Sequence, residues 1–168
     1  MVSQTNEKHK EQSPVNVECS VITLSDSIKE LDDDLSGNYI VKKVKEKYTL
    51  NSRSLIHDEA DSLLEEIEKA IGNETEVIIT TGGTGLNKRD ITVETVEPLF
   101  EKKLDGFGEI FRLKSYEEIG ASAILSRATG GVYKKTLIFA LPGSPNAVKT
   151  GLDIIINELG HFVHHARK

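Results

Sequence analysis

The chain has 168 residues, enough for about one domain, and its 38% hydrophobic content is ordinary for a globular protein. Its 21 basic and 27 acidic residues give a net charge of −6, which argues against a nucleic-acid coat protein. The single cysteine, Cys19, excludes an intramolecular disulfide, and no apolar run approaches the ~20 residues that a membrane-spanning helix needs. We therefore expect a soluble, cytoplasmic, single-domain protein with no nucleic-acid or membrane partner.

The first segments predict a tail, a strand and a helix. Residues 1–16 carry almost no apolar side chain, so we expect a mobile tail there and a domain over 17–168. Residues 17–24 are typical of a buried strand. Residues 36–48 then show apolar side chains at helical spacing, with Ser36 as the expected N-cap.

The middle of the chain predicts two strands that flank a helix. Residues 49–56 form a candidate strand, and residues 77–81 form a short, strongly apolar strand that we expect to be covered on both faces. Between them, Leu63 and Ile67 lie on one face of a helix that ends at Gly72.

The second half of the chain predicts mostly helices. The expected elements are a helix over 92–100, weaker helices over 107–114 and 117–123, a strand over 136–141, and a final helix with an apolar stripe from 148 to 162. Pro98 should kink or split the first of these helices. Ser144 should cap the last one, with Pro145 in its first position.

Strands and helices alternate along the chain, which predicts an α/β domain whose mainly parallel sheet is covered by helices on both faces. Ligands of such sheets bind beyond the carboxyl ends of the strands. The chain places unusual segments after its strands, at residues 25–26, 57–58, 82–90 and 142–146. We expect these four segments to meet at one edge of the sheet.

The loop Gly82-Gly83-Thr84-Gly85 follows the apolar strand directly. Glycine permits positive φ and close approach of a ligand, and the inward N–H groups of such a loop form an anion-binding nest. The loop lacks the Gly-Lys-Ser/Thr step of a P-loop, and Lys88 stands where a Rossmann fingerprint needs its third glycine. A phosphate site and a plain strand-to-helix turn are the two interpretations.

Two aspartates come with these segments. Lys88 and Arg89 would reinforce phosphate binding, whereas Asp90 beside them would repel phosphate unless a Mg²⁺ lay between. Asp58 opens a helix at the same predicted edge, and together the two carboxylates suggest metal-assisted phosphoryl or nucleotidyl transfer. The alternative is that Asp58, and Asp90 or Thr92, simply cap the helices that follow.

Four further features carry weaker signals. The turn over 142–146 leads into a helix N-terminus and offers a second anion site, or a cap alone. The three histidines of 161–165 have the spacing of metal ligands, but they lie at a helix end that favours cations, so we interpret them as structural. We interpret Asp32–Asp34 as an acidic surface loop and Cys19 as an inert core thiol.

Taken together and in order, these motifs resemble the MoaB/Mog family of molybdenum-cofactor biosynthesis proteins. The resemblance covers about residues 17–165. It rests on the runs Thr80-Thr81-Gly82-Gly83-Thr84-Gly85, Arg89-Asp90-Ile91-Thr92 and Leu141-Pro142-Gly143-Ser144-Pro145-Asn146-Ala147, supported by Ser25-Asp26-Ser27, Ser36-Gly37 and His57-Asp58-Glu59. It implies a single three-layer α/β/α domain of the molybdopterin-binding fold.

The resemblance also implies an activity. Active members of the family use Mg-ATP to adenylylate the terminal phosphate of molybdopterin and release pyrophosphate. The two essential acids of the family match Asp58 and Asp90, which are implied to hold Mg²⁺, and their presence favours an active enzyme. The alternatives are a non-catalytic molybdopterin carrier or scaffold, and a nucleotide-binding module without pterin selectivity.

Further binding residues and partners follow from the same resemblance. Gly82, Gly83, Thr84 and Gly85 are implied to cradle the pterin or its phosphate, with Ser25, Asp26, Ser144 and Asn146 as additional binding candidates. The family implies a homotrimer or homohexamer and a downstream metal-insertion enzyme. The sequence does not distinguish a molybdenum pathway from a tungsten pathway.

Overall fold

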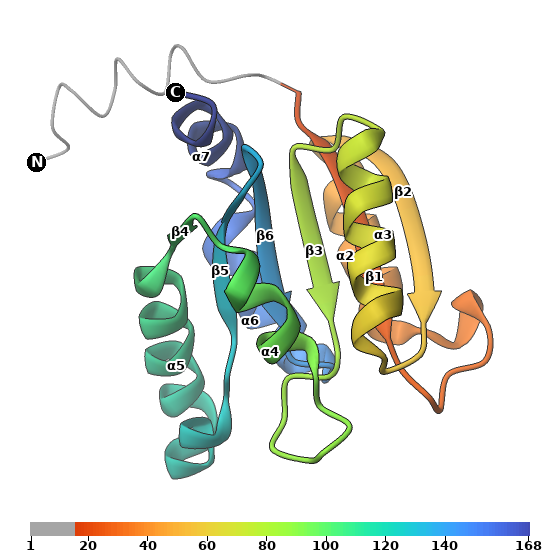
Figure 1. Cartoon of the computed structure of the whole chain (residues 1–168). Helices are drawn as coiled ribbons and strands as arrows, with labels where there is room; N and C mark the ends of the chain where they lie inside the picture. Colours follow the sequence, from red (N-terminus) through yellow and green to blue (C-terminus); the bar gives the residue numbers. More distant parts are fainter. Residues whose placement is uncertain (1–15) are drawn as a thin grey trace, which may run out of the picture.

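The computed structural model describes residues 16–168 and contains one six-stranded sheet in the order β2-β1-β3-β6-β5-β4 (Figure 1). Four strands run parallel: β1 (Glu18–Leu24), β2 (Thr49–Ile56), β3 (Val77–Thr81) and β6 (Thr136–Leu141). The two strands β5 (Thr129–Tyr133) and β4 (Lys102–Lys103) complete one edge in antiparallel pairing. The predicted mainly parallel sheet is confirmed, whereas the expected N-terminal tail lies, apart from Asn16, outside the described residues.

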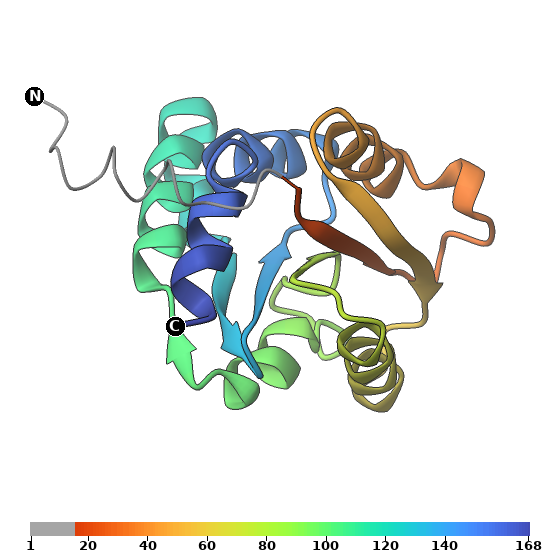
Figure 2. The same ribbon diagram turned by 90° about the horizontal axis from the view of Figure 1, so that it is seen from above.

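Helices cover both faces of this sheet, as Figure 2 shows from above. One face carries α2 (Leu35–Lys45), α5 (Asp105–Ile119), α6 (Pro145–Ile155) and α7 (Leu159–Ala166). The other face carries α3 (Ala60–Gly72) and the short α4 (Thr92–Val96). The domain is therefore the three-layer α/β/α sandwich that the sequence predicts.

The central strand β3 explains why the sequence around it is apolar without interruption. Val77 and Ile79 pack into the core cluster beneath α2 and α6, whereas Ile78 between them packs into the cluster beneath α3. All five residues of the strand are buried. Because both faces of β3 are covered, no position on it tolerates a solvated side chain.

The start of α2 differs from the prediction. Its N-cap is Asp34 rather than Ser36, and the Asp34 carboxylate accepts a hydrogen bond of 2.8 Å from the Gly37 N–H. Asp34 is fully buried, accepts a second hydrogen bond of 2.6 Å from Thr23 and pairs with Arg53 at 3.3 Å. The expected acidic surface loop is therefore wrong at this residue, because its charge is satisfied inside the fold.

The helical region after β3 also divides differently. Pro98 does split its helix, since α4 ends at Val96 and a 3-10 helix over Glu97–Leu99 follows. The two weak helices expected next form one continuous helix, α5, which ends at Gly120 with φ +63° and is followed by the 3-10 helix η3 (Gly120–Leu125). A glycine with that φ ends an α-helix, whereas the polar residues before it do not.

The predicted final helix is two helices, α6 and α7. The Tyr48 hydroxyl donates a hydrogen bond of 2.9 Å to the carbonyl of Ile156, which an uninterrupted helix would use for its own N–H four residues on. This contact from a distant part of the chain ends α6. The cap predicted at its other end is confirmed, because Ser144 accepts from the Ala147 N–H and Pro145 is the first helical residue.

The sequence did not predict β5 and β4. Gly130 and Gly131 interrupt any apolar alternation in β5, yet a Cβ on Gly131 would lie 2.3 Å from the Phe100 ring. The glycine is therefore required by close packing of the strand against Phe100, which lies just before β4. Within the described part of the chain, no helix is long and apolar enough to cross a membrane.

Candidate functional site

The four segments expected at one edge of the sheet do meet there, at the carboxyl ends of the parallel strands (Figure 1). The Ser25 N–H donates to the Ile56 carbonyl at 3.0 Å, and the Gly82 N–H donates to the Leu141 carbonyl at 3.1 Å. The Thr81 hydroxyl reaches the Pro142 carbonyl at 3.1 Å. These contacts join the segment after β1 to the end of β2, and the start of the glycine-rich loop to the end of β6 and the segment after it.

The glycine-rich loop, Gly82–Gly85, needs glycine at its first two positions. Gly82 has φ +98° and Gly83 has φ +63°, and a Cβ on Gly82 would lie 2.2 Å from the Leu24 carbonyl oxygen. Any other residue at position 82 would combine an unfavourable φ with a backbone clash. The strand-to-loop turn is therefore set by the closeness of β1.

In this loop the carbonyl groups form hydrogen bonds within the described part of the protein, whereas most of the N–H groups do not. Its carbonyls, from Gly82 to Gly85, each accept a hydrogen bond from Thr92 or Arg127. By contrast, the N–H groups of residues 83–86 donate no hydrogen bond to any part of the chain that the structure describes. Four consecutive free N–H groups are what an anion-binding nest, as the sequence suggests it, would require.

Asp58 lies against this loop and does not cap a helix. The N-cap of α3 is Glu59, without a side-chain hydrogen bond. One carboxylate oxygen of Asp58 accepts from the Asp26 N–H at 3.2 Å, while Oδ1 is buried and has no hydrogen-bond partner among residues 16–168. A Cβ on Gly83 would lie 3.2 Å from that Oδ1. Burial, with the nearby Asp26 and Asp90 charges, raises the pKa of Asp58 above its ordinary value.

Asp90 lies against the same loop, two residues further along it. Its Oδ2 accepts a hydrogen bond of 2.8 Å from the Asn87 N–H, and a Cβ on Gly85 would lie 2.6 Å from the same oxygen. The N-cap of α4 is Ile91, without a side-chain hydrogen bond, and the Thr92 hydroxyl bonds the Gly82 carbonyl instead. Helix capping therefore explains neither aspartate.

Arg89 has a different partner from the one we expected. It pairs with Asp26, and its Nε donates to Asp26 Oδ2 at 3.0 Å, rather than extending over the nest. This hydrogen bond holds the pKa of Asp26 below its ordinary value. The Asp58 N–H donates to the other Asp26 oxygen at 3.3 Å, so Asp26 connects Arg89 to Asp58.

Two cavities open on either side of the glycine-rich loop. The loop cavity, about 430 Å³, is lined by all four loop residues, Asp90 and Ser144, and on its far wall by Phe111, Ser115, Ile119, Ser122, Leu125 and Ser126. The second cavity, about 320 Å³, is lined among others by Ser25, Ser36 and Thr81. Gly82 and Gly143 line both, so the two cavities share a wall of backbone without side chains.

The remaining site candidates are more peripheral. Asn146 is exposed in the first turn of α6 and lines neither cavity, and the Asp26 and Asp58 side chains also lie outside both linings. Sequence reasoning missed the far wall, because its residues fall in helices that the periodicity predicts only weakly. Ser126 is the informative member of that wall, since its hydroxyl oxygen is buried without a hydrogen-bond partner among the described residues.

Two other candidate groups have structural explanations. The ring centroids of His161 and His165 lie 4.7 Å apart in an edge-to-face arrangement, and residues 16–168 contain no cluster of three His, Cys, Asp or Glu that could hold a metal. Cys19 is fully buried, and burial raises its pKa to about 12. Its thiol is therefore inert, as the sequence predicts.

Comparison with known proteins agrees with this geometry. Residues 20–161 match the family described as "Probable molybdopterin binding domain". The chain is 42% identical over 167 residues to "Molybdopterin adenylyltransferase" of Pyrococcus furiosus, covering 96% of this chain and 98% of that protein. It is 41% identical over 166 residues to "Molybdenum cofactor biosynthesis protein B" of Bacillus subtilis, covering 96% and 97%.

The fold comparison leads to the same family. The crystal structure of the tungsten cofactor synthesizing protein MoaB from Pyrococcus furiosus superimposes with a TM-score of 0.86 at 40% identity. The match covers 93% of this chain and 100% of that one. The chain therefore belongs to the molybdopterin-binding domain family, in its MoaB/Mog branch.

Proposed function

We propose that this protein is a molybdopterin adenylyltransferase, which transfers AMP from ATP to the terminal phosphate of molybdopterin and releases pyrophosphate. The observation that carries the proposal is the nest of four free N–H groups with Asp58 and Asp90 against it. A site for phosphate alone would exclude carboxylates, whereas a site for phosphate and a cation needs them. The name of the Pyrococcus furiosus relative supports the same reaction.

The two aspartates fit Mg²⁺ as the cation. Their carboxylate oxygens are the ligands that Mg²⁺ prefers, and Asp58 Oδ1 is buried without a hydrogen-bond partner among residues 16–168. Mg²⁺ commonly binds through one or two carboxylates, with phosphates and water supplying the other ligands. When bound, the ion neutralises phosphate charge.

The chain's own residues then have mainly a positioning role. A phosphate oxygen of molybdopterin forms a bond to the α-phosphorus of ATP, and the bond from that phosphorus to the bridging oxygen breaks, so that pyrophosphate leaves with the electron pair. The free N–H groups of residues 83–86 hold phosphate oxygens in place. The transfer needs the two substrates in line more than it needs covalent chemistry from the protein.

The two cavities give each substrate its own place. Gly82 and Gly143 form their shared wall, and neither contributes a side chain that would separate the reacting phosphates. Ser25 lines the second cavity and Ser144 the loop cavity, which makes both hydroxyls binding candidates. Asp26 acts indirectly through Asp58, and Asn146 is the most peripheral of the candidates.

We further propose that the protein forms a homo-oligomer through α5 and η3. Six of the nine exposed large hydrophobic side chains in the described part of the chain lie on these two elements: Ile110, Leu113, Tyr116, Ile119, Ile124 and Leu125. A monomer rarely exposes so many apolar side chains on one surface. A second copy of the chain covers this surface in the homotrimer or homohexamer that the family resemblance implies.

The proposed setting follows from the reaction. ATP as co-substrate is consistent with a cytoplasmic enzyme, and a metal-insertion enzyme would consume the adenylylated product. The decisive experiment incubates the protein with molybdopterin, ATP and Mg²⁺ and detects adenylylated molybdopterin by mass spectrometry. Binding of molybdopterin without adenylylated product would indicate a carrier, and ATP binding without pterin binding would indicate a general nucleotide-binding module.

A further inference from the structure

The nest described above depends on where the loop carbonyls point. In a trans peptide unit the C=O and the following N–H point in opposite directions. A donor that holds the carbonyl of one residue therefore fixes the N–H of the next residue on the other side. The free N–H groups of the nest are turned toward a ligand only if something holds the loop carbonyls away from it.

Two residues hold these carbonyls. Thr92 follows the loop closely in sequence and binds its first half, with the hydroxyl 2.8 Å from the Gly82 carbonyl and the N–H 2.9 Å from the Gly83 carbonyl. Arg127 comes from the segment before β5, 42 residues beyond Gly85, and binds the second half. Its Nε donates to the Thr84 carbonyl at 3.0 Å and its Nη2 donates to the Gly85 carbonyl at 2.5 Å.

Arg127 is itself held in place from α4. Both Nη atoms donate to the Glu94 carboxylate, with Nη2 at 3.2 Å from Oε2. The guanidinium group therefore uses its fork of donors on two carbonyls and one carboxylate together, which a lysine ammonium cannot reproduce. Glu94 in turn connects the loop support to the same helix that begins with Thr92.

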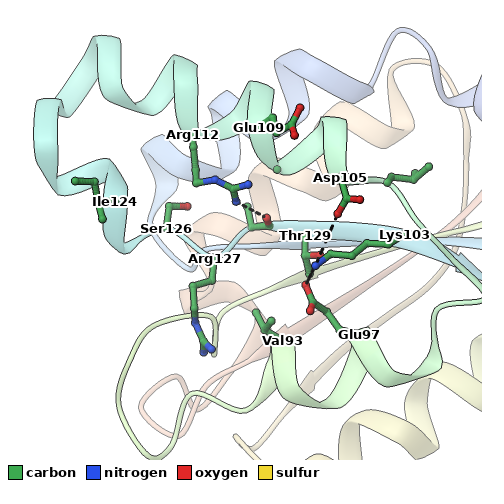
Figure 3. Close-up of a pocket in the computed structure, with 13 residues that line it drawn as sticks. Val93, Glu97, Lys103, Asp105, Glu109, Arg112, Ile124, Ser126, Arg127 and Thr129 are labelled. Atoms are coloured by element: carbon green, nitrogen blue, oxygen red, sulfur yellow. Dashed lines mark hydrogen bonds and ion pairs between the residues drawn. The ribbon is translucent and has the colours of Figure 1, made fainter.

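The Arg127 side chain faces a different cavity from the one that the glycine-rich loop lines. Arg127 lines a third cavity of about 550 Å³, the rear cavity, together with Arg112, Glu97 and Lys103, and none of the four loop residues lines it. In Figure 3, Arg112 and Arg127 start from neighbouring walls of this cavity and point in different directions. Among residues 16–168, Arg112 donates to the Ala128 carbonyl, at 3.4 Å, and makes no hydrogen bond to the loop.

We propose that Arg127 is a positioning residue of the transfer site, which turns the N–H groups of Gly85 and Leu86 toward the substrate phosphates by holding the Thr84 and Gly85 carbonyls on the rear-cavity side. The inference deepens the proposed function and rests on it, because it assigns the part of the nest that receives phosphate. Arg127 touches neither substrate and acts through the loop alone.

The test measures binding of inorganic pyrophosphate by calorimetry to the parent, to Arg127→Ala and to Arg112→Ala. Arg127→Ala should bind pyrophosphate more weakly than the parent, on the order of tenfold to a hundredfold, because the N–H groups of Gly85 and Leu86 are no longer held in place. Arg112→Ala removes the same side chain from the same cavity and should bind as the parent does. Equal binding by Arg127→Ala, or an equal loss in Arg112→Ala, would overturn the proposal.

A second readout separates positioning from general stability. The rear cavity gives guanidinium ion a path to the space that Arg127→Ala leaves, so millimolar guanidinium should restore much of the lost affinity, and urea at the same concentration should not. If Arg127→Ala fails to fold, Glu94→Gln tests the proposal instead. This variant removes the charged partner of the Arg127 guanidinium group while it keeps the side-chain volume at position 94. Glu94→Gln should weaken pyrophosphate binding in the same direction by a smaller factor, and unchanged binding would overturn the proposal.

The outcomes also separate this inference from the proposed function. A parent that binds pyrophosphate but makes no adenylylated molybdopterin would contradict the adenylyl transfer and leave the role of Arg127 in phosphate binding standing. A parent that binds no pyrophosphate would overturn the nest and, with it, the role of Arg127.

Discussion

The ionised carboxylate of Asp58 destabilises the folded protein. Its Oδ1 is buried without a hydrogen-bond partner among residues 16–168, and burial together with Asp26 and Asp90 raises its pKa. A raised carboxyl pKa in the folded state means that the ionised form opposes folding above that pKa. This destabilisation disappears at pH values below the pKa that Asp58 has in the unfolded chain, because the carboxyl group is then protonated in both the folded and the unfolded state. A site that is unfavourable in the free protein is typical of one that awaits a cation.

We therefore expect Asp58→Asn to raise the melting temperature near neutral pH. The asparagine oxygen can still accept the hydrogen bond from the Asp26 N–H, while the unfavourable charge is gone. The increase should shrink as the pH falls toward about 4, the usual carboxyl pKa, and should vanish below it. Thermal melting across this pH range, in buffer without Mg²⁺, measures the effect.

The matched control is Asp61→Asn, at an exposed carboxylate in the first turn of α3. That carboxylate interacts favourably with the helix dipole, so its removal should leave the melting temperature unchanged or lower it slightly. A melting temperature of Asp58→Asn below that of the parent near neutral pH would show that the Asp58 charge is satisfied in the free protein.

Cys19 should be inert to thiol reagents as long as the protein is folded. Its side chain is fully buried and its pKa is raised to about 12, so almost no thiolate exists in mildly alkaline buffer. Absorbance of a thiol-exchange reagent should show labelling only after denaturant unfolds the chain. Rapid labelling of the native protein would mean that β1 opens in solution.

At the scale of elements, α5 offers two glycines with opposite roles. Gly106 lies in its first turn and Gly120 ends it, and a Cβ would meet nothing within 4 Å at either position. Gly120 has φ +63° and ψ −143°, a conformation that is essentially restricted to glycine. Space is therefore the same at the two sites, and only the backbone conformation differs.

The pair predicts opposite shifts in stability. Gly106→Ala should increase the free energy of unfolding by about 0.5–1 kcal/mol, because alanine favours the helix. Gly120→Ala should decrease it by about 1–3 kcal/mol, because the conformation at the helix end becomes strained. Urea denaturation of the two variants measures both, and equal shifts would contradict the assigned helix end.

The secondary-structure elements also differ in whether the sequence predicted them. Strands β1, β3 and β6 were predictable because each combines an apolar run with a turn after it, whereas the mostly polar β2 was only a candidate strand. The polar segments that follow these four strands located the site edge. Strand β5 was not predictable, because Gly130 and Gly131 are there for close packing against distant rings. The break between α6 and α7 escaped prediction for the same reason, since it depends on a hydroxyl from Tyr48.

In the candidate site, too, features with a local sequence signal were predictable, whereas features that depend on distant contacts were not. The glycine-rich loop and the aspartates belong to segments that follow predicted strands, so the sequence predicted that they lie close together. Whether Asp58 and Asp90 only cap helices is a question of hydrogen-bond partners, which the structure answers against capping. The role of Arg127 depends on a contact 42 residues distant in sequence, for which the local sequence carries no signal.

At the scale of the whole molecule, the surface of α5 and η3 predicts self-association. Leu113 is 61% exposed near the middle of the apolar stripe on α5, so a glutamate there would place a charge in the interface. Leu113→Glu should sediment as a smaller species than the parent at the same concentration. Lys45→Glu, at an exposed position on α2, is the control and should sediment as the parent does. A monomeric parent, or a Leu113→Glu variant of unchanged mass, would contradict the assigned interface.

The proposed activity requires that Asp90 serves the transfer rather than the fold. An asparagine at this position can still accept the hydrogen bond from the Asn87 N–H, so Asp90→Asn should melt close to the parent. It cannot supply the negative charge that a Mg²⁺ between phosphates requires.

The most direct test is the single-turnover rate of AMP transfer to molybdopterin at saturating Mg-ATP, measured for the parent, Asp90→Asn and the control Asp61→Asn. We predict a loss of at least about a hundredfold for Asp90→Asn, the scale of removing a preorganised charged group, and a parental rate for Asp61→Asn. A near-parental rate for Asp90→Asn would contradict the role of this carboxylate in transfer, and no transfer by the parent would contradict the proposed activity itself.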